Sequence, residues 1–344
     1  MEKFERLSFD DCVELLHSDE LPTLGYWANE FLTKIHPDQS SVRTYNIERN
    51  INYTNICISN CSFCAFCRSP NSPDGYVLND EILLSKIAET VALGGKQILL
   101  QGGLNPHLPL EWYEKLLRQI KNNFPNINIH GFSPTEIAFL ADHFGLSDSE
   151  TLQRLHNAGL GSLPGGGAEI LVDRVRQKLS PNKASTKRWL NVCKEWHKLG
   201  GRGSATMMFG HIETIKEQAE HLLKLRNLQD ETNGFTSFIP WTFQPNNTKI
   251  SHIKKTGTWE YLRLLATSRL FLDNFKTIQS SWVTQGLEIG VLGLSFGAND
   301  LGSVMIEENV VAAAGTIHRS NEQEFKQTIK NAGYIAKRRN ENIL

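Results

Sequence analysis

Hydrophobic residues occur along the chain in short runs that alternate with longer stretches in which they recur every three or four residues. Short runs bounded by turn residues predict β-strands, and the longer periodicity predicts amphipathic helices. The predicted strands are Ile51–Ile56, Gln97–Gln101, Ile127–Phe132, Leu160–Leu163, Gly203–Met208, Gly234–Ile239, Thr277–Trp282 and Asn299–Leu301. The predicted helices between them are Asp80–Leu93, Leu110–Asn122, Pro134–Ala158, Ala168–Lys178, Ser185–Leu199, Glu213–Leu228, Thr258–Asn274 and Gly286–Phe296. Eight strands alternating with helices indicate an α/β fold, a parallel (β/α)8 TIM-type barrel with right-handed crossovers.

The two ends of the chain do not follow this alternation. Residues 8–38 predict two short helices, and Asn321–Ala332 predicts a last helix followed by a tail, AKRRNENIL, that looks frayed. No internal repeat, low-complexity tract or Pro/Ser-rich linker divides the chain. We therefore expect a short helical N-terminal cap over residues 1–45, a barrel over residues 46–320, and a C-terminal helix and tail over residues 321–344.

Composition and charge narrow the class of protein. The 344 residues are 40% hydrophobic and 21% charged, and the formal net charge of −1 provides no global basic field for nucleic acid. No apolar run approaches the roughly 20 residues that a membrane span requires. The first residues, MEKFERLSFDDCVELL, lack the apolar core of a secretory signal. We expect a cytoplasmic protein that neither binds nucleic acid nor spans a membrane.

Glycines follow the predicted strands at three places, at Gly102–Gly103, at Gly165–Gly167 and at Gly210. All three lie at the C-terminal ends of strands, which is the face where barrel enzymes carry their active sites. Glycine lets the backbone approach a ligand closely. Loops between strands and helices are also glycine-rich for purely structural reasons, so an ordinary turn is the alternative at each place.

Four of the six cysteines lie within eleven residues, at Cys57, Cys61, Cys64 and Cys67, and such a cluster is typical of a metal site. Cys57, Cys61 and Cys64 have the spacing C-x-x-x-C-x-x-C. Three thiolates can hold three irons of a cubane and leave the fourth iron open. Cys61, Cys64 and Cys67 alone would suit a ferredoxin, but a ferredoxin has its longer gap last, not first. A zinc site is the weaker alternative, because no His pair or second C-x-x-C accompanies the cluster at zinc-finger spacing.

This spacing resembles that of the radical S-adenosylmethionine (SAM) superfamily. The resemblance implies a 4Fe–4S cluster on Cys57, Cys61 and Cys64, whose open iron binds the amino and carboxylate groups of SAM. Phe63 matches the aromatic position beside the adenine, and Gln101, Gly102 and Gly103 correspond to the motif that meets the SAM amino group, with Gln in place of its acid. Glu169, which follows the three glycines, is a candidate for the SAM ribose or for the positive end of a helix.

Beyond the cysteines, the chain resembles the cyclic dehypoxanthinyl futalosine synthases of the futalosine route to menaquinone. The resemblance covers about residues 45–320 and rests on RNINYTNICISNCSFCAF, QILLQGGLNP, SLPGGGAEILVDRVR, SATMMFGHIE, RNLQDETNGFTSFIPWTFQPNNT, IQSSWVTQG, FGANDLGS and EENVVAAAGTIHR. Cys67 departs from the pattern, which usually has a residue other than cysteine there. The alternatives are a sibling enzyme, such as aminofutalosine synthase or an FO synthase subunit, and a non-catalytic iron–sulfur electron-transfer protein.

The resemblance implies that an adenosyl radical removes the C4′ hydrogen of dehypoxanthinyl futalosine, and that the sugar radical then closes onto the benzoate ring. It also implies a low-potential electron donor such as flavodoxin or ferredoxin. The candidate residues for the final proton transfer are His211 and Glu213, which could equally form a surface pair. The candidates for substrate binding are Trp241, Phe243, Gln244, Asp300, Arg68 and Arg319, with the two arginines as partners for the substrate carboxylate and a core role as the alternative for the aromatic residues.

Overall fold

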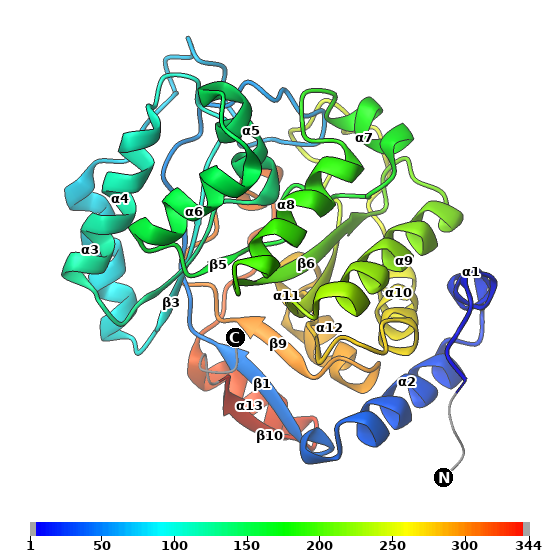
Figure 1. Cartoon of the computed structure of the whole chain (residues 1–344). Coiled ribbons are helices and arrows are strands. Elements are labelled where there is room, and N and C mark those ends of the chain that lie inside the picture. Colours follow the sequence, from blue (N-terminus) through cyan, green and yellow to red (C-terminus); the bar gives the residue numbers. More distant parts are fainter. Residues whose placement is uncertain (1–4, 340–344) are drawn as a thin grey trace.

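The computed structural model describes residues 5–339 and contains a seven-stranded sheet in which every pairing of neighbours is parallel. Its strands follow the chain order, as Figure 1 shows. They are β2 (Asn50–Asn52), β3 (Gln97–Gln101), β4 (Asn128–Gly131), β5 (Ser162–Leu163), β6 (Arg202–Phe209), β7 (Phe235–Thr242) and β8 (Thr277–Ile278). The predicted parallel α/β fold is therefore confirmed.

A second, three-stranded parallel sheet joins the two ends of the first. It has the order β10–β1–β9 and consists of β1 (Val42–Asn46), β9 (Asp300–Ser303) and β10 (Ile335–Arg338). The backbone N–H of Ser280 donates to Asp300 O (2.8 Å), and that of Asn50 donates to Glu307 O (3.1 Å). The two sheets together therefore surround one central space, and β9 supplies the predicted eighth strand.

Neither β1 nor β10 was predicted, and β10 corrects the expectation of a frayed tail from residue 336 onward. The sequence of β10 is short and polar, so it carries no strand periodicity, and it forms only because β1 offers a free edge in register with it. Residues 340–344 of the predicted tail lie outside the described part of the chain.

Helices cover the outside of the ring. They are α3 (Asp80–Ala92), α4 (Leu110–Asn123), α5 (Pro134–Phe144), α6 (Asp148–Ala158), α7 (Asp173–Leu179), α8 (Thr186–Lys198), α9 (Ile215–Thr232), α10 (Thr258–Phe271), α11 (Trp282–Gln285), α12 (Leu287–Leu292) and α13 (Glu322–Asn331), with short 3-10 turns at Pro37–Gln39, Gly293–Ser295 and Ala312–Ala314. The predicted helix Pro134–Ala158 is two helices, because Gly145 takes a left-handed φ of 66° and Ser147 caps α6 through a hydrogen bond with Glu150.

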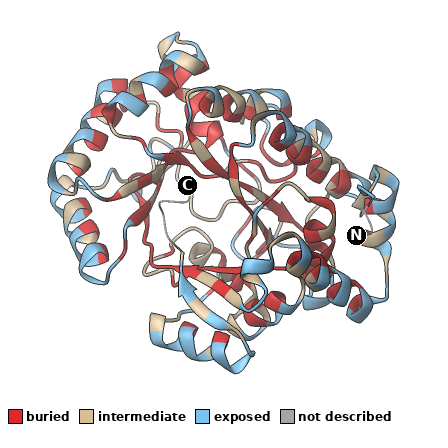
Figure 2. Cartoon of the chain, turned by 60° about the horizontal axis from the view of Figure 1, so that its bottom comes forward, coloured by how far each residue is buried: buried red, intermediate tan, exposed pale blue. Residues whose placement is uncertain are grey.

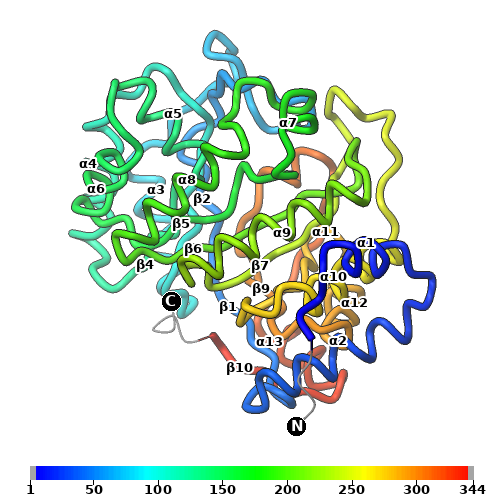
Figure 3. The backbone as a smooth tube through the Cα atoms, turned by 45° about the vertical axis from the view of Figure 1, so that its right-hand side comes forward, coloured from blue at the N-terminus to red at the C-terminus, as the bar shows by residue number. Residues whose placement is uncertain are grey.

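The predicted N-terminal helices are α1 (Phe9–His17) and α2 (Leu21–Ile35). They pack on the outside of the barrel, α1 against α9 and α2 against α10, as Figure 3 shows. Among the described residues, every helix is too short or too polar to cross a lipid bilayer.

The strands bury opposite kinds of residue on their two faces. In β3, Ile98 and Leu100 are fully buried against the helices, while Gln97, Leu99 and Gln101 face the central space. Because side chains alternate along a strand, mostly polar residues at the inward positions give the ring an apolar outside and a largely polar inside. Figure 2 shows the buried strands enclosed by helices whose outer faces are exposed.

Candidate functional site

A cavity of about 730 Å³ occupies the centre of the barrel. Its wall consists largely of polar side chains at alternate strand positions. They include Thr44, Asn46, Glu48, Asn50, Gln97, Gln101, His130, Ser204, Thr206, Ser237, Gln279, Ser281 and Ser303. This volume lies within the usual range of small-molecule sites.

A hydrogen-bond network crosses the cavity at the end where the barrel strands begin, since Gln97 and Asn128 are the first residues of β3 and β4. Glu48 accepts hydrogen bonds from Asn46 Nδ2 and from Gln97 Nε2 (2.6 Å), and Arg339 NH2 lies 3.7 Å from its carboxylate. Gln97 Oε1 in turn accepts from Asn128 Nδ2 (2.5 Å). Burial raises the pKa of Glu48, and Arg339 opposes this rise. The carboxylate is thus buried with partners on several sides, and the C-terminal segment supplies one of them.

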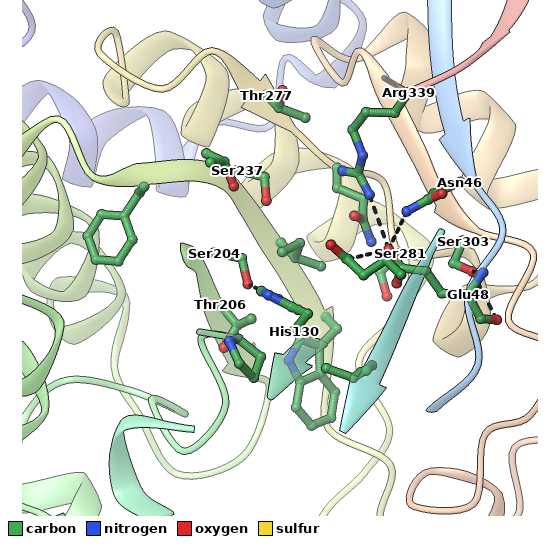
Figure 4. A pocket seen from close by; sticks show the side chains of 18 of the residues that line it. Asn46, Glu48, His130, Ser204, Thr206, Ser237, Thr277, Ser281, Ser303 and Arg339 are labelled. Carbon is green, nitrogen blue, oxygen red and sulfur yellow. Dashed lines mark hydrogen bonds and ion pairs between the residues drawn. The ribbon is translucent and has the colours of Figure 1, made fainter. Parts of the chain in front are cut away.

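His130 extends these polar contacts toward the loop that contains Gly165–Gly167. Its Nδ1 lies 2.7 Å from Ser162 Oγ and its Nε2 lies 3.3 Å from Ser204 Oγ, which accepts a hydrogen bond from the backbone N–H of Gly165. Burial, with a further contribution from Arg339, lowers the pKa of His130 to about 3, so the imidazole is neutral. Figure 4 shows His130 and Ser204 across the cavity from Arg339 and Asn46.

Residues 57–67, which carry four cysteines and which we call the cysteine loop, follow β2 at the C-terminal edge of the sheet, as expected. The loop is tied at its base, where Cys57 N donates to Arg68 O and Arg68 N donates to Asn55 O, both at 2.8 Å. The Arg68 guanidinium donates to the carbonyls of Ala65, Phe66 and Cys67 at 3.0–3.2 Å. Arg68 therefore holds the loop, and its NH1 is directed at the loop backbone.

The thiols lie along this loop. Ser59 Oγ lies 3.0 Å from Cys57 Sγ and 3.3 Å from Cys61 Sγ. A hydrogen bond from Cys67 lowers the pKa of Cys64, and the same bond raises the pKa of Cys67. Among the described residues, no group of three His, Cys, Asp or Glu is close enough to hold a single metal ion. Cys57, Cys61 and Cys64 nevertheless lie on one loop and are thiols, which is the donor type that an iron–sulfur cluster takes.

The glycines after β3 pack directly on this loop. A Cβ on Gly103 would overlap the carbonyl of Ile56 and lie 2.8 Å from Cys57 Cβ, so only glycine permits this approach. The backbone N–H of Gly102 donates to Glu136 Oε1 (3.0 Å), which also accepts from the Tyr53 hydroxyl (2.8 Å). Glu136 was not predicted as a site residue, although its capping-box position after Ser133 was visible in the sequence.

The loop after β5 forms the adjoining part of the wall. Pro164, Gly166, Gly167 and Glu169 all line the cavity. Gly167 has a φ of +75°, and a Cβ there would overlap Thr135. Glu169 also has a left-handed backbone (φ 40°), which is uncommon for a residue other than glycine. Such a conformation persists where the surroundings enforce it, often at a functional site.

Glu169 connects the cavity to the cysteine loop. Its Oε1 accepts a hydrogen bond from Lys183 Nζ (3.0 Å), and its Oε2 is buried without a hydrogen-bond partner, with Arg176 NH1 3.6 Å away. Burial acts to lower the pKa of Lys183, but Cys61 and Glu169 outweigh it and raise that pKa. The Lys183 ammonium also lies 5.0 Å from the centre of the Phe63 ring. The buried acceptor oxygen fits a hydroxyl or amino donor of a bound SAM.

The candidates after β6 and β7 occupy two different environments. Trp241 lines the cavity, whereas His211, Glu213, Phe243 and Gln244 lie behind its wall. His211 Nε2 lies 3.0 Å from Met208 O, and its Nδ1 lies 2.7 Å from Glu213 Oε2. Burial raises the pKa of Glu213, but the interactions with His211 and the hydrogen bonds from Gly210 and Gln218 together outweigh it and bring that pKa to about 2.

The other two members of this group have internal partners. Phe243 packs with its ring centre 6.2 Å from that of His211, and Gln244 bonds the Thr242 hydroxyl and carbonyl at 3.0 Å and accepts from Thr316. These contacts fix the backbone around Trp241. In this structure they leave the four side chains without direct access to the cavity.

The remaining candidates lie in the last part of the chain, from β9 onward. Asp300 is fully buried at the start of β9, where it accepts from Thr44 Oγ1 (2.5 Å) and from Gly302 N (2.7 Å). Arg339 NH1 is 3.6 Å from its carboxylate. Arg319 is exposed. Glu308 instead lines the cavity and accepts from three backbone N–H groups at 2.8–3.0 Å.

Comparisons with known proteins agree with this arrangement. The model of the radical SAM superfamily matches residues 51–225, and the CofH/MqnC C-terminal region matches residues 232–343. The chain is 50% identical to the cyclic dehypoxanthine futalosine synthase of Halalkalibacterium halodurans, over 97% of this chain and 90% of that protein. It is 42% identical to the protein of the same name from Streptomyces coelicolor, over 97% and 84%.

A further relative has a different name. The 5-amino-6-(D-ribitylamino)uracil–L-tyrosine 4-hydroxyphenyl transferase of Methanocaldococcus jannaschii is 40% identical over 86% of this chain and 85% of that protein. Among solved structures, methylornithine synthase (PylB) superposes with a TM-score of 0.75 at 19% identity, covering 97% of this chain and 95% of that one. HydG, a maturase of the FeFe-hydrogenase, gives 0.76 at 15% identity, over 97% and 73%. These two similarities support the barrel fold alone.

Proposed function

This chain belongs to the radical SAM superfamily and, within it, to the family of cyclic dehypoxanthine futalosine synthases, and from that premise we propose how it acts. It binds a 4Fe–4S cluster through Cys57, Cys61 and Cys64 and SAM beside it, and it converts dehypoxanthinyl futalosine into the cyclic product for menaquinone biosynthesis. The observation that carries this proposal is Glu169, which lines the cavity and contacts the cysteine loop through Lys183.

The cluster and SAM, when bound, supply one electron and a 5′-deoxyadenosyl radical that removes the C4′ hydrogen. The chain positions the reactants. Glu169 Oε2 is a buried acceptor that gains a partner if a SAM hydroxyl or amino group faces it. Gln101 faces the same part of the cavity, and Phe63 extends from the cysteine loop. We propose that these residues hold SAM between the loop and the glycines.

The substrate then occupies the cavity beneath. Trp241 offers an aromatic surface at the end of β7, which suits the benzoate ring. The hydroxyls and amides of the lumen, such as Ser204, Thr206 and Ser281, suit the sugar. Arg339 and Glu48 lie at the end of the cavity where the strands begin, and their network limits the entry of water from that end. A carbon radical needs this protection from water.

The test uses the reconstituted protein under anaerobic conditions with SAM, dithionite and dehypoxanthinyl futalosine. Mass spectrometry should find a product two hydrogens lighter than the substrate, with 5′-deoxyadenosine formed in proportion. Deuterium placed at C4′ should appear in the 5′-deoxyadenosine. Deuterium from another sugar position, with none from C4′, would overturn the proposed reaction. Transfer of a 4-hydroxyphenyl group from tyrosine to the ribitylaminouracil would instead assign the activity of the second group of relatives.

A further inference from the structure

The surface around the cysteine loop has an unusual charge distribution. Asp and Glu make up 37 of the 344 residues, and the net charge is −1. Three segments that meet at this loop, residues 57–73, 177–188 and 244–259, nevertheless contain no Asp or Glu. Apart from Lys187 on the outer surface of α8, the exposed lysines of these segments are Lys178, Lys249, Lys254 and Lys255, which we call the basic rim.

Backbone contacts bring the three segments together. The N–H of Ser62, between Cys61 and Cys64, donates to Leu179 O (2.8 Å), next to Lys178. The carbonyl of Ser62 accepts from Lys249 N (2.9 Å), and the Lys249 ammonium donates to the Asn60 side chain. The cysteine loop thus lies between the end of α7 and the segment that carries the other three lysines. Figure 3 shows that yellow segment beside α7.

The loop also presents an apolar residue to solvent. Ile58, adjacent to Cys57, is 42% exposed, and its backbone N–H is fixed by Leu104 O (3.1 Å). A protein interface usually has an apolar centre and a polar border. Interfaces for electron transfer are small and transient, and an exposed isoleucine on the same loop as the contacts of Leu179 and Lys249 suits an interface of that kind.

We propose that Ile58 and the basic rim form the docking surface for an acidic, low-potential one-electron carrier protein. The inference rests on the proposed function, because it requires a cluster in the cysteine loop. In each encounter the carrier is oxidised by one electron and the cluster is reduced by one, with no other bond made or broken. Charge complementarity selects an acidic partner, and the position of the rim brings its redox centre close to the cysteines.

The charge attraction also predicts a kinetic signature. Complementary charges raise the rate of encounter and lose their effect as salt screens them. Small reductants such as dithionite and reduced methyl viologen have no protein surface to dock. Reduction by a protein carrier should therefore depend on the rim, and reduction by the small molecules should not.

The experiment compares a triple variant, Lys178→Glu/Lys254→Glu/Lys255→Glu, with a control, Lys115→Glu/Lys330→Glu/Lys216→Glu, whose exposed or part-exposed lysines lie on α4, α13 and α9. Both variants change the net charge equally. The readout is 5′-deoxyadenosine formation with an acidic flavodoxin and its reductase, and separately with dithionite and with reduced methyl viologen. Lys249 is left unchanged because it contacts the cysteine loop.

With flavodoxin at low salt, the rim variant should lose about tenfold or more in rate while the control stays near the unmodified protein. The gap should close near 0.5 M salt, where screening acts over only about 4 Å. Rates with both small reductants should stay within about twofold. A parallel measurement of oxidised flavodoxin binding should show weaker affinity and a shallower salt dependence for the rim variant only.

Each other outcome overturns the docking proposal. Equal losses with flavodoxin and with the small reductants would make the rim part of the cluster environment. An unchanged flavodoxin rate at low salt would place docking elsewhere, and equal losses in the control would indicate a general charge effect. If the unmodified protein formed no cyclic product with dithionite, the proposed function itself would fail, and this result is separate from all of the above.

Discussion

The part of the chain that matches the radical SAM model, residues 51–225, and the part that matches the CofH/MqnC C-terminal region, residues 232–343, build the site differently. In the first part, the residues proposed to bind the cluster and SAM lie in loops that follow strands, as with Cys57 and Glu169. In the second part, Trp241 lines the cavity while its neighbours Phe243 and Gln244 pack behind it.

The two parts differ in whether the site residues can be recognised from neighbouring positions in the sequence. A cluster loop and a glycine turn are local, so their spacing in sequence reports their function. A cavity wall depends on which face of a strand points inward, and a shift of one residue moves a side chain from the wall to the core. The first part therefore carries local motifs as well as one side of the cavity wall, whereas the second part contributes to the site through the packing that completes that wall.

The largest expected effect belongs to the first part. Changing Cys57, Cys61 or Cys64 to Ala should abolish SAM cleavage, because a cubane with one open iron needs three protein thiolates. Cys67→Ala should keep most of the iron and activity. Iron content and 5′-deoxyadenosine formation measure both. Loss of the cluster in Cys67→Ala together with its retention in Cys57→Ala would show that the ligand set is wrong.

The second prediction separates wall from core in the C-terminal part. Trp241→Ala should reduce cyclisation on the order of 100-fold, since a small misplacement of the sugar has that cost, while iron content and thermal stability remain. Phe243→Ala should instead cost about 3–5 kcal/mol of unfolding free energy, with a smaller effect on turnover of the folded fraction. Product assays and urea titrations distinguish them. The reverse pattern would remove the distinction between wall and core.

The third prediction concerns SAM affinity. Glu169→Gln keeps the size of the side chain but removes the charge that faces Lys183 and Arg176. If Oε2 accepts from SAM, the KM for SAM should rise about tenfold, since a hydrogen bond to a charged group contributes about 1.5–3 kcal/mol. The KM for the substrate should change little. An unchanged KM for SAM would assign Glu169 to the support of Lys183 alone.

The smallest expected effect is a decrease of the free energy of unfolding as the pH falls. Burial lowers the pKa of His130 and His221 to about 3 and that of His197 to about 4. The unfolded chain, with a pKa near 6.5, binds protons that the folded chain does not, so stability falls as pH drops below about 6.5. Each histidine contributes at most about 1.4 kcal/mol per pH unit.

The variant His221→Gln should reduce this slope by up to one proton in urea titrations between pH 7.5 and 5. His252→Gln, on an exposed segment of the C-terminal part, is the matched control and should leave the slope unchanged. Equal slopes in all three proteins would show that His221 does not remain neutral on folding.

Much of the fold was accessible from the sequence because periodicity and strand-end glycines are local signals. The cysteine loop and the glycine turns belong to the same group. The polar lumen has a local signal as well, since Gln97 and Gln101 share one face of a strand and Ser204 and Thr206 share one face of another. Polar residues on a strand indicate an inward-facing wall only once closure of the barrel is known. The pairing of β1 with β10 and the contact of Arg339 with Glu48 were inaccessible, since they depend on tertiary closure.

The position of β1 has a consequence for how the chain reaches this structure. β1 pairs only with β9 and β10 within the described residues, and its Val42 is matched to Ile335. A ribosome therefore releases β1 long before either neighbour exists. Pairings between such distant segments are slow to form, so closure of the ring is expected to be the last event of folding. Until then the backbone N–H and C=O groups of β1 have no strand partner.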